Sequence, residues 1–128
     1  MAIAAISQQL VAEIAESYPD LAALNLSSNH ISEIENLEPL SRLASLDLRD
    51  NHIASLEGLG GGRLGALREL NVSRNRITGV ACGRCEQLQE LDLGDNAVRD
   101  WSQIEALGAA FPKLRRLVLR GNPVCQDE

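Results

Sequence analysis

Aromatic residues are scarce in this 128-residue chain. One tryptophan, one tyrosine and one phenylalanine make up 2% of it, although 45% of its residues are hydrophobic. The length is sufficient for one domain of ordinary size. The core of that domain must therefore be filled by aliphatic side chains, mainly leucine. This composition favours a stack of thin, similar layers over a globule built around large rings.

Basic residues are also few, because twelve lysines and arginines stand against eighteen acidic residues, for a formal net charge of −6. Nucleic-acid binding draws much of its affinity from cationic side chains that neutralise phosphates. The charge balance therefore argues against nucleic acid as a partner. It argues equally against non-specific attraction to an anionic membrane surface.

The three cysteines are too few for a disulfide-dense secreted scaffold. No hydrophobic run approaches the length of a membrane span. Residues 1–18 lack a basic n-region and are interrupted by polar side chains, unlike a signal peptide. We therefore expect a reduced, cytoplasmic protein that does not associate with membranes.

One pattern, Leu-x-x-Leu-x-Leu-x-x-Asn-x-Ile, occurs five times with small variations. Its asparagines are spaced by 22, 24, 21 and 26 residues, which is typical of short solenoid repeats. They are Asn29, Asn51, Asn75, Asn96 and Asn122, and we predict a structural role for each.

The repeat predicts the fold. Its central Leu-x-Leu indicates a short strand with alternate side chains facing inward. The asparagine follows where the chain turns, and its side chain can bond the otherwise unpaired backbone there. No single repeat buries its own apolar face, so stacking creates the core. We predict an α/β solenoid, right-handed, with short parallel strands on the concave face and an irregular or short helical convex side.

The ends of the solenoid need covering. Residues 3–17 predict an amphipathic helix, so residues 1–18 are interpreted as an N-terminal capping helix. Residues 19–125 hold about five repeats. Residues 126–128 form a polar tail, and we expect the natural chain to continue beyond it.

The convex side of the second repeat is rich in glycine, with Gly58, Gly60, Gly61, Gly62 and Gly65. Such a segment can be a loose loop or a phosphate cradle. The loop is favoured, because no Gly-Lys-Ser/Thr follows.

Asp100 is a good N-cap for a short helix in the fourth repeat, and Gln103 stands where a capping box would place it. Trp101 aligns with convex positions of the earlier repeats. That alignment favours a core tryptophan over an exposed partner-binding hot spot. The aligned residues are Ile34, Leu56 and Val80.

Cys82 and Cys85 form a C-x-x-C, a spacing used by zinc and redox sites. They align with convex core positions of the first repeat, so structural thiols are favoured. His30 and His52 follow successive asparagines and should stack about 5 Å apart. An exposed pair is favoured there over a metal site. We predict no metal and no cofactor.

Polar residues on and beside the outward strand positions are the predicted partner-binding site. The middle of this face is acidic and the last repeat is basic, which suits a protein partner with a basic or amphipathic segment. A merely solvated face explains the same residues equally well. The predicted site residues are Ser45, Asp47, Arg49, Asp50, Glu69, Asn71, Arg74, Glu90, Asp92, Asp95, Arg116 and Arg120.

The chain is not expected to be an enzyme. Its paired carboxylates lie on an open sheet, where nothing supplies the burial that raises a carboxyl pKa. No Ser-His-Asp or Cys-His arrangement accompanies them.

The recurring pattern resembles the short, roughly 22-residue class of leucine-rich repeats. That class includes the regulatory subunit of protein phosphatase 1, the axonemal dynein light chains and the tubulin-folding cofactors. Residues 98–101 and Gly121-Asn122-Pro123 are similar to the last repeat of the dynein light chains. Residues 14–29 are similar to the opening of the repeat domain of messenger-RNA export receptors.

The resemblance implies a non-enzymatic adaptor that binds a partner through the concave face. A dynein, axonemal or tubulin-associated component is favoured, with a cytoplasmic location that is cytoskeletal, ciliary or flagellar. A phosphatase-regulatory scaffold and a module of an RNA-export receptor are the alternatives. We expect a monomer or weak self-association through the open C-terminal end.

Overall fold

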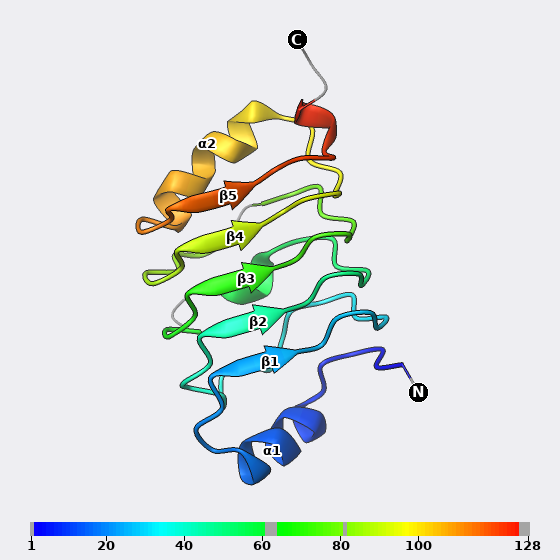
Figure 1. Cartoon of the computed structure of the whole chain (residues 1–128), viewed down its shortest axis with the longest axis vertical. Helices are drawn as coiled ribbons and strands as arrows, with labels where there is room; N and C mark the ends of the chain where they lie inside the picture. The colour runs from blue at the N-terminus through cyan, green and yellow to red at the C-terminus, as the bar shows by residue number, and fades with distance from the viewer. Residues whose placement is uncertain (1, 61–63, 81, 126–128) are drawn as a thin grey trace.

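The computed structural model describes residues 2–60, 64–80 and 82–125. Five short strands form one parallel sheet, in the order in which they occur in the chain (Figure 1). The predicted α/β solenoid with parallel strands is confirmed. The strands are β1 (Ala23–Asn25), β2 (Ser45–Asp47), β3 (Glu69–Asn71), β4 (Glu90–Asp92) and β5 (Arg116–Val118).

Leucine fills the space behind the sheet. The middle residues of β2, β3 and β4 are Leu46, Leu70 and Leu91, and none is more than 3% exposed. The middle residues of the two outer strands are only partly buried, because each has a neighbouring strand on one side alone. The convex residues predicted from the first repeat, Ile34, Leu37 and Leu40, are buried as expected.

A column of asparagines joins each repeat to the one before it. In Asn75, Nδ2 donates to the carbonyl oxygens of Leu48 (3.0 Å), Val72 (3.0 Å) and Ser73 (3.1 Å). Its Oδ1 accepts from the backbone nitrogen of Ile53 at 2.9 Å. Leu48 and Ile53 belong to the preceding repeat, so one side chain connects two layers. Asn51, Asn96 and Asn122 make the same pair of bonds to the repeat before each of them.

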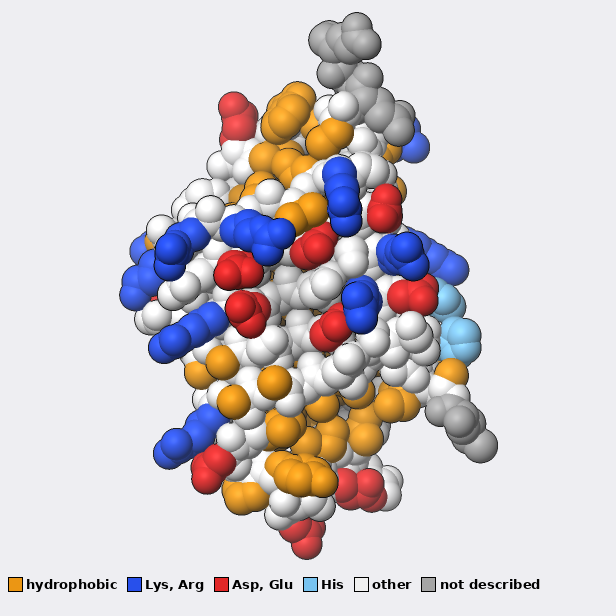
Figure 2. Space-filling view, in the orientation of Figure 1, with side chains coloured by type: hydrophobic (Ala, Val, Ile, Leu, Met, Phe, Trp, Pro, Cys, Tyr) orange, Lys and Arg blue, Asp and Glu red, His pale blue; other side chains and the backbone are white. Residues whose placement is uncertain are grey.

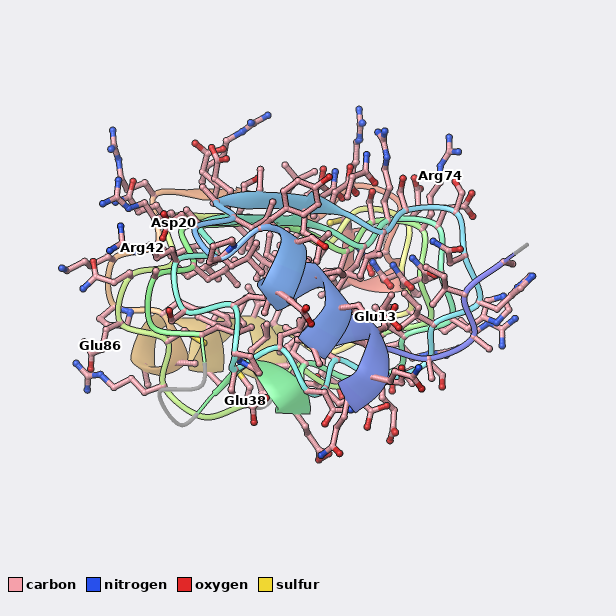
Figure 3. The ribbon with its side chains drawn as sticks, turned by 90° about the horizontal axis from the view of Figure 1, so that it is seen from below. Glu13, Asp20, Glu38, Arg42, Arg74 and Glu86 are labelled. Atoms are coloured by element: carbon pink, nitrogen blue, oxygen red, sulfur yellow. The ribbon has the colours of Figure 1, made fainter. Side chains whose placement is uncertain are left out.

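The N-terminal segment covers the open end of the first repeat (Figure 3). Helix α1 spans Gln8–Ser17, so the helix predicted over residues 3–17 is wrong for its first five residues. The nitrogen of Ile3 donates to Asn29 Oδ1 at 2.8 Å, and its carbonyl oxygen accepts from the nitrogen of His30 at 2.8 Å. Ile3 thus takes the place of a preceding repeat. In a helix that began at Ile3, its carbonyl oxygen would have accepted from the nitrogen of Ser7 and could not have bonded His30 in this way.

A second helix, α2 (Trp101–Ala110), lies on the convex side of the fourth repeat. Asp100 stands at the predicted N-cap position, although its side chain makes no capping hydrogen bond. The expected capping box does not form, because the side chain of Gln103 accepts a hydrogen bond from the nitrogen of Val80 at 3.1 Å instead. Gln103 therefore connects α2 to the neighbouring repeat.

The prediction that Trp101 lies in the core is wrong, because its side chain is 55% exposed. Trp101 begins α2, and the helical period then directs Ile104 and Leu107 toward the core. Trp101 falls at the edge of that face. The alignment with earlier repeats failed here because no α-helix begins at Ile34, Leu56 or Val80.

The glycine-rich segment of the second repeat is partly ordered and close-packed. A 3-10 helix, η1, spans Glu57–Leu59. A Cβ atom on Gly58 would lie 1.5 Å from the carbonyl oxygen of Ile34, and one on Gly60 would lie 2.2 Å from the nitrogen of Gly83. The expectation of a loose loop is therefore wrong at these two glycines. Gly61 and Gly62 lie outside the described residues.

The asparagine column predicts the cost of removing one member. Asn75→Ala would leave the buried N–H of Ile53 without its partner, and we expect the free energy of unfolding to fall by about 2–4 kcal/mol. Asn25→Ala is the control, since Asn25 is exposed and accepts one bond, from the nitrogen of Ser27. It should cost about 1 kcal/mol or less. Urea unfolding measures both, and equal losses would contradict the structural role of the column.

The close approach at Gly58 gives a second prediction. Gly58→Ala should lower the free energy of unfolding by about 2 kcal/mol or more, since the backbone of Ile34 must move. A Cβ atom on Gly79 meets nothing within 4 Å, so Gly79→Ala should change stability by about 0.5 kcal/mol or less. Thermal unfolding of both variants distinguishes a loss of stability caused by the steric clash at Gly58 from a general loss caused by replacing glycine. An equal change in stability of the two variants would show that the convex loop can move to accommodate a Cβ atom at Gly58.

Candidate functional site

The outer surface of the sheet is the candidate site, and we call it the concave face. The pairing register aligns Ala23, Ser45, Glu69, Glu90 and Arg116 in one column. It aligns Asn25, Asp47, Asn71, Asp92 and Val118 in the next. Both columns match those expected from the repeat. Figure 2 shows acidic and basic side chains intermingled over the middle of this face, with hydrophobic side chains toward the N-terminal end.

Two shallow hollows adjoin on the concave face, and Asn71 and Asp92 line both. The first, about 280 Å³, lies over β2 to β5. Ser45, Leu46, Asp47, Glu69, Leu70, Asn71, Glu90, Leu91, Asp92, Arg116 and Val118 line it. The second, about 360 Å³, lies beyond the carboxyl ends of the strands. Ser28, Arg49, Asp50, Asn71, Ser73, Arg74, Asp92, Gly94, Asp95 and Arg120 line it. All twelve predicted site residues therefore lie along one continuous surface.

Polar residues of the second column form a hydrogen bond at the carboxyl ends of β1 to β4, whereas β5 has Val118 at this position. Asp47 Oδ1 accepts a hydrogen bond from the nitrogen of Arg49 at 3.1 Å, and Asp92 Oδ1 accepts one from Gly94 at 2.9 Å. Asn71 makes the same turn with Ser73 at 3.0 Å. Because asparagine and aspartate both form such turns, the fold requires an oxygen at these positions and not a charge.

The residue directly before each asparagine of the column has a positive φ. This left-handed backbone turns the chain from the sheet back into the body, and it places the side chain at the rim of the second hollow. The repeat pattern did not predict it, although serine, aspartate and glycine at these positions were a signal. The five residues are Ser28 (58°), Asp50 (60°), Arg74 (57°), Asp95 (54°) and Gly121 (80°). Arg74 lies on the strand side of the molecule in Figure 3.

Charge pairing on the concave face is incomplete. Arg49 Nε lies 3.5 Å from Asp47 Oδ2, and Arg116 Nη1 lies 3.8 Å from Glu90 Oε1. Both arginine side chains are more than half exposed, so these pairs contribute little to stability. Glu69 forms no ion pair with any residue that the structure describes. Its carboxylate stands beside that of Glu90 in the register, which concentrates negative charge there.

The two histidines stack as expected, with the ring centroids of His30 and His52 separated by 5.2 Å and the rings tilted by 47°. Among the described residues, no group of three or more His, Cys, Asp or Glu side chains is arranged to hold a metal ion. The histidine pair thus has no third protein ligand within that part of the chain.

The two cysteines of the C-x-x-C differ in their surroundings. Cys85 is buried, and its Sγ donates to the carbonyl oxygen of Leu59 at 3.2 Å. Cys82 is only half-buried but packs against the core, so the expectation that both thiols occupy core positions holds fully for Cys85 and in part for Cys82. A hydrogen bond between the two thiols raises the pKa of Cys82, with burial adding to the effect, and lowers the pKa of Cys85.

Membrane insertion finds no support in the helices. Within residues 2–60, 64–80 and 82–125, neither the length nor the hydropathy of any helix suits a membrane span.

The chain resembles known repeat proteins in sequence. A family model described as leucine rich repeat matches residues 41–98. The human (Homo sapiens) tubulin-specific chaperone cofactor E-like protein is 34% identical over 123 residues, which cover 88% of this chain and 28% of that protein. The Rattus norvegicus protein of the same name is 38% identical over 60 residues, which cover 45% of this chain and 14% of that protein. The chain therefore spans less than a third of the length of these relatives.

The fold is also found in a solved structure, the crystal structure of the Drosophila melanogaster SNF/U2A' complex. The superposition has a TM-score of 0.79 at 24% sequence identity, and it covers 98% of this chain and 74% of that chain. At this identity the likeness concerns the fold alone. The family match over the central repeats agrees with the five-stranded parallel sheet and the asparagine column, and the chain has the leucine-rich-repeat fold.

Proposed function

We propose that this chain is the protein-interaction module of a tubulin-associated protein and that it binds its partner through the concave face. The observation on which the proposal depends is the gathering of all twelve predicted residues along two adjoining hollows of one surface. The names of the human and rat relatives support a tubulin-associated partner. This chain covers only a part of those relatives, so their activities are not transferred to it.

The charges of the face support a partner with a basic or amphipathic segment. The turns at Asp47 and Asp92 would form equally well with asparagine, which Asn71 and Asn25 already provide. The fold therefore does not explain why these two positions are charged. Complementary charge at an interface accelerates encounter and fixes register, which gives the charges a purpose.

Apolar atoms in the first hollow support an amphipathic segment in particular. Val118, whose side chain is partly exposed, closes its C-terminal end, whereas the side chains of Leu46, Leu70 and Leu91 face the core. A helix or strand with one basic edge and one aliphatic edge would pair its charges with the carboxylates and cover Val118. Burial of the exposed part of Val118 would add to the affinity.

The non-enzymatic character and the cytoplasmic, cytoskeletal location stay predictions. The carboxylates of the face are solvated, and an open sheet offers no enclosed site in which a reaction could be shielded from water. A binding role needs neither burial nor a nucleophile, so it agrees better with this surface.

The proposal predicts the effect of removing charge without disturbing the turns. A variant with Asp47→Asn, Glu69→Gln, Glu90→Gln and Asp92→Asn keeps every side-chain length and the hydrogen bonds of both turns. We expect its affinity for purified tubulin to fall at least about tenfold, equivalent to about 1.4 kcal/mol. The affinity of the wild-type chain should also weaken as salt is raised, because the lost interactions are between exposed charges. Binding to immobilised tubulin would measure both the affinity of the variant and the salt dependence of the wild-type affinity.

The matched control removes four exposed carboxylates outside the concave face, with Glu16→Gln, Glu33→Gln, Glu57→Gln and Glu105→Gln. It has the same net charge as the test variant and should bind like the wild type. Equal weakening of both variants would mean that only net charge matters, and the concave face would lose its role. Failure of the wild type to bind tubulin would remove tubulin as the partner. A pull-down from cell lysate with the same variants then separates the dynein, phosphatase and RNA-export alternatives.

A further inference from the structure

The C-x-x-C turn lies between two elements of neighbouring repeats on the convex side. The nitrogen of Cys85 donates to the carbonyl oxygen of Ala110, at the end of α2, at 2.7 Å. On its other side, Cys85 Sγ donates to Leu59 at 3.2 Å. The backbone of Gly83 touches that of Gly60, where even a Cβ atom would not fit. The turn is therefore fixed from both sides and is not a free loop.

The two cysteines differ in their exposure to solvent, so one can react with solutes while the other is protected. Cys82 is half-buried, so solutes can reach its thiol, whereas Cys85 is 6% exposed. The two thiols are close enough to share a hydrogen bond. Four residues that close a ring through two adjacent sulfurs are the arrangement in which dithiols and disulfides exchange readily.

We propose that Cys82 and Cys85 are a reversible thiol–disulfide site, oxidised by exchange with a low-molecular-weight disulfide such as glutathione disulfide. The site is separate from the concave face, and the proposal does not depend on the identity of the binding partner.

The exchange takes place in two steps. The thiolate of Cys82 attacks one sulfur of glutathione disulfide, which breaks that S–S bond, forms a mixed disulfide and releases one glutathione as its thiolate. The thiolate of Cys85 then attacks the sulfur of Cys82, forms the intramolecular S–S bond and displaces the second glutathione. Both protein protons end on the two glutathione thiols. The protein loses two electrons and the glutathione disulfide gains them.

Different properties of the two cysteines serve these two steps. Exposure allows Cys82 to meet a bulky disulfide, although its raised pKa makes the first step slow. Cys85 is too buried for that encounter, but it lies three residues from Cys82, so it can attack the mixed disulfide within the same chain. Because the second step is intramolecular, the mixed disulfide should be short-lived.

Cys125 provides an internal comparison. It is exposed in the 3-10 helix η2 (Pro123–Cys125), and its Sγ donates to the carbonyl oxygen of Leu119 at 3.3 Å. Its position in the last repeat leaves it without a second thiol among its hydrogen-bond partners. Glutathione disulfide should therefore convert Cys125 to a stable mixed disulfide and not to an intramolecular bond.

The test uses the whole chain carrying Cys125→Ser, equilibrated in glutathione redox buffers, quenched with acid and weighed by mass spectrometry. We expect the mass to fall by two hydrogen atoms and to recover with excess reduced glutathione. The equilibrium constant for the folded protein should exceed that for the same chain in urea by about tenfold or more, because the fold holds the two sulfurs together. The chain that carries both Cys82→Ser and Cys125→Ser should instead show little modification, since Cys85 is buried.

Two results would overturn the proposal. One is the absence of a species lighter by two hydrogen atoms in oxidising buffer, whether the mass stays unchanged or rises by the glutathionyl group of a stable mixed disulfide. The other is an equilibrium constant in the folded protein equal to or below that in urea, which would show that the fold does not favour the bond. Cys82 is half-buried, so the chain that carries both substitutions should fold. Its far-ultraviolet circular dichroism, compared with that of the Cys125→Ser chain, verifies this.

Discussion

The hydrogen bonds of the asparagine column are the constraint on which the other features depend. Each buried asparagine after the first bonds backbone groups of its own turn and of the turn before it, so a single side chain closes one repeat and attaches the next. The turn would otherwise hold buried N–H and C=O groups without partners, which a folded protein rarely tolerates. At the N-terminal end the same requirement explains why Ile3 is not helical. It supplies Asn29 and His30 with the backbone groups that a preceding repeat would have offered.

Because the column fixes the stacking of the repeats, it also fixes which side chains become neighbours on the concave face. Residues about 22 positions apart in sequence lie side by side, and the face becomes a grid whose contents can vary without altering the fold. The alternation of Asn25, Asp47, Asn71 and Asp92 illustrates this freedom. All four close the same type of turn, yet only two are charged. The fold is therefore equally compatible with a charged or a neutral side chain at these positions. Binding of a partner is a sufficient reason for the charged ones.

The sequence periodicity correctly predicted the structural features that recur in every repeat. It did not predict the features that occur in one repeat only. The strands, the asparagine column and the two concave columns follow from one spacing, and the structure has them in the expected register. Trp101 was misplaced because a helix begins at that residue, and a helix changes which positions face the core. Helix α1 begins at Gln8 after its N-cap Ser7, whose hydroxyl accepts a hydrogen bond from the nitrogen of Leu10 at 3.1 Å, a local signal that the hydrophobic period overlooked. The non-helical backbone at Ile3 depends on a tertiary bond to Asn29 that no local pattern contains. The exposure of Cys82 depends likewise on how two loops meet.

The concave face and the C-x-x-C turn lie on opposite sides of the solenoid, and the asparagine column explains why they are chemically separable. The turn contacts η1 and the end of α2, both on the convex side, through Leu59 and Ala110. The sheet is held by the hydrogen bonds between its strands and by the side chains of the asparagine column, whose hydrogen bonds do not involve Cys82 or Cys85. A new S–S bond on the convex side would therefore strain or relax α2 before it moved any strand. The grid of charges on the concave face would keep its spacing in either redox state, since that spacing is fixed by hydrogen bonds that the thiols do not enter.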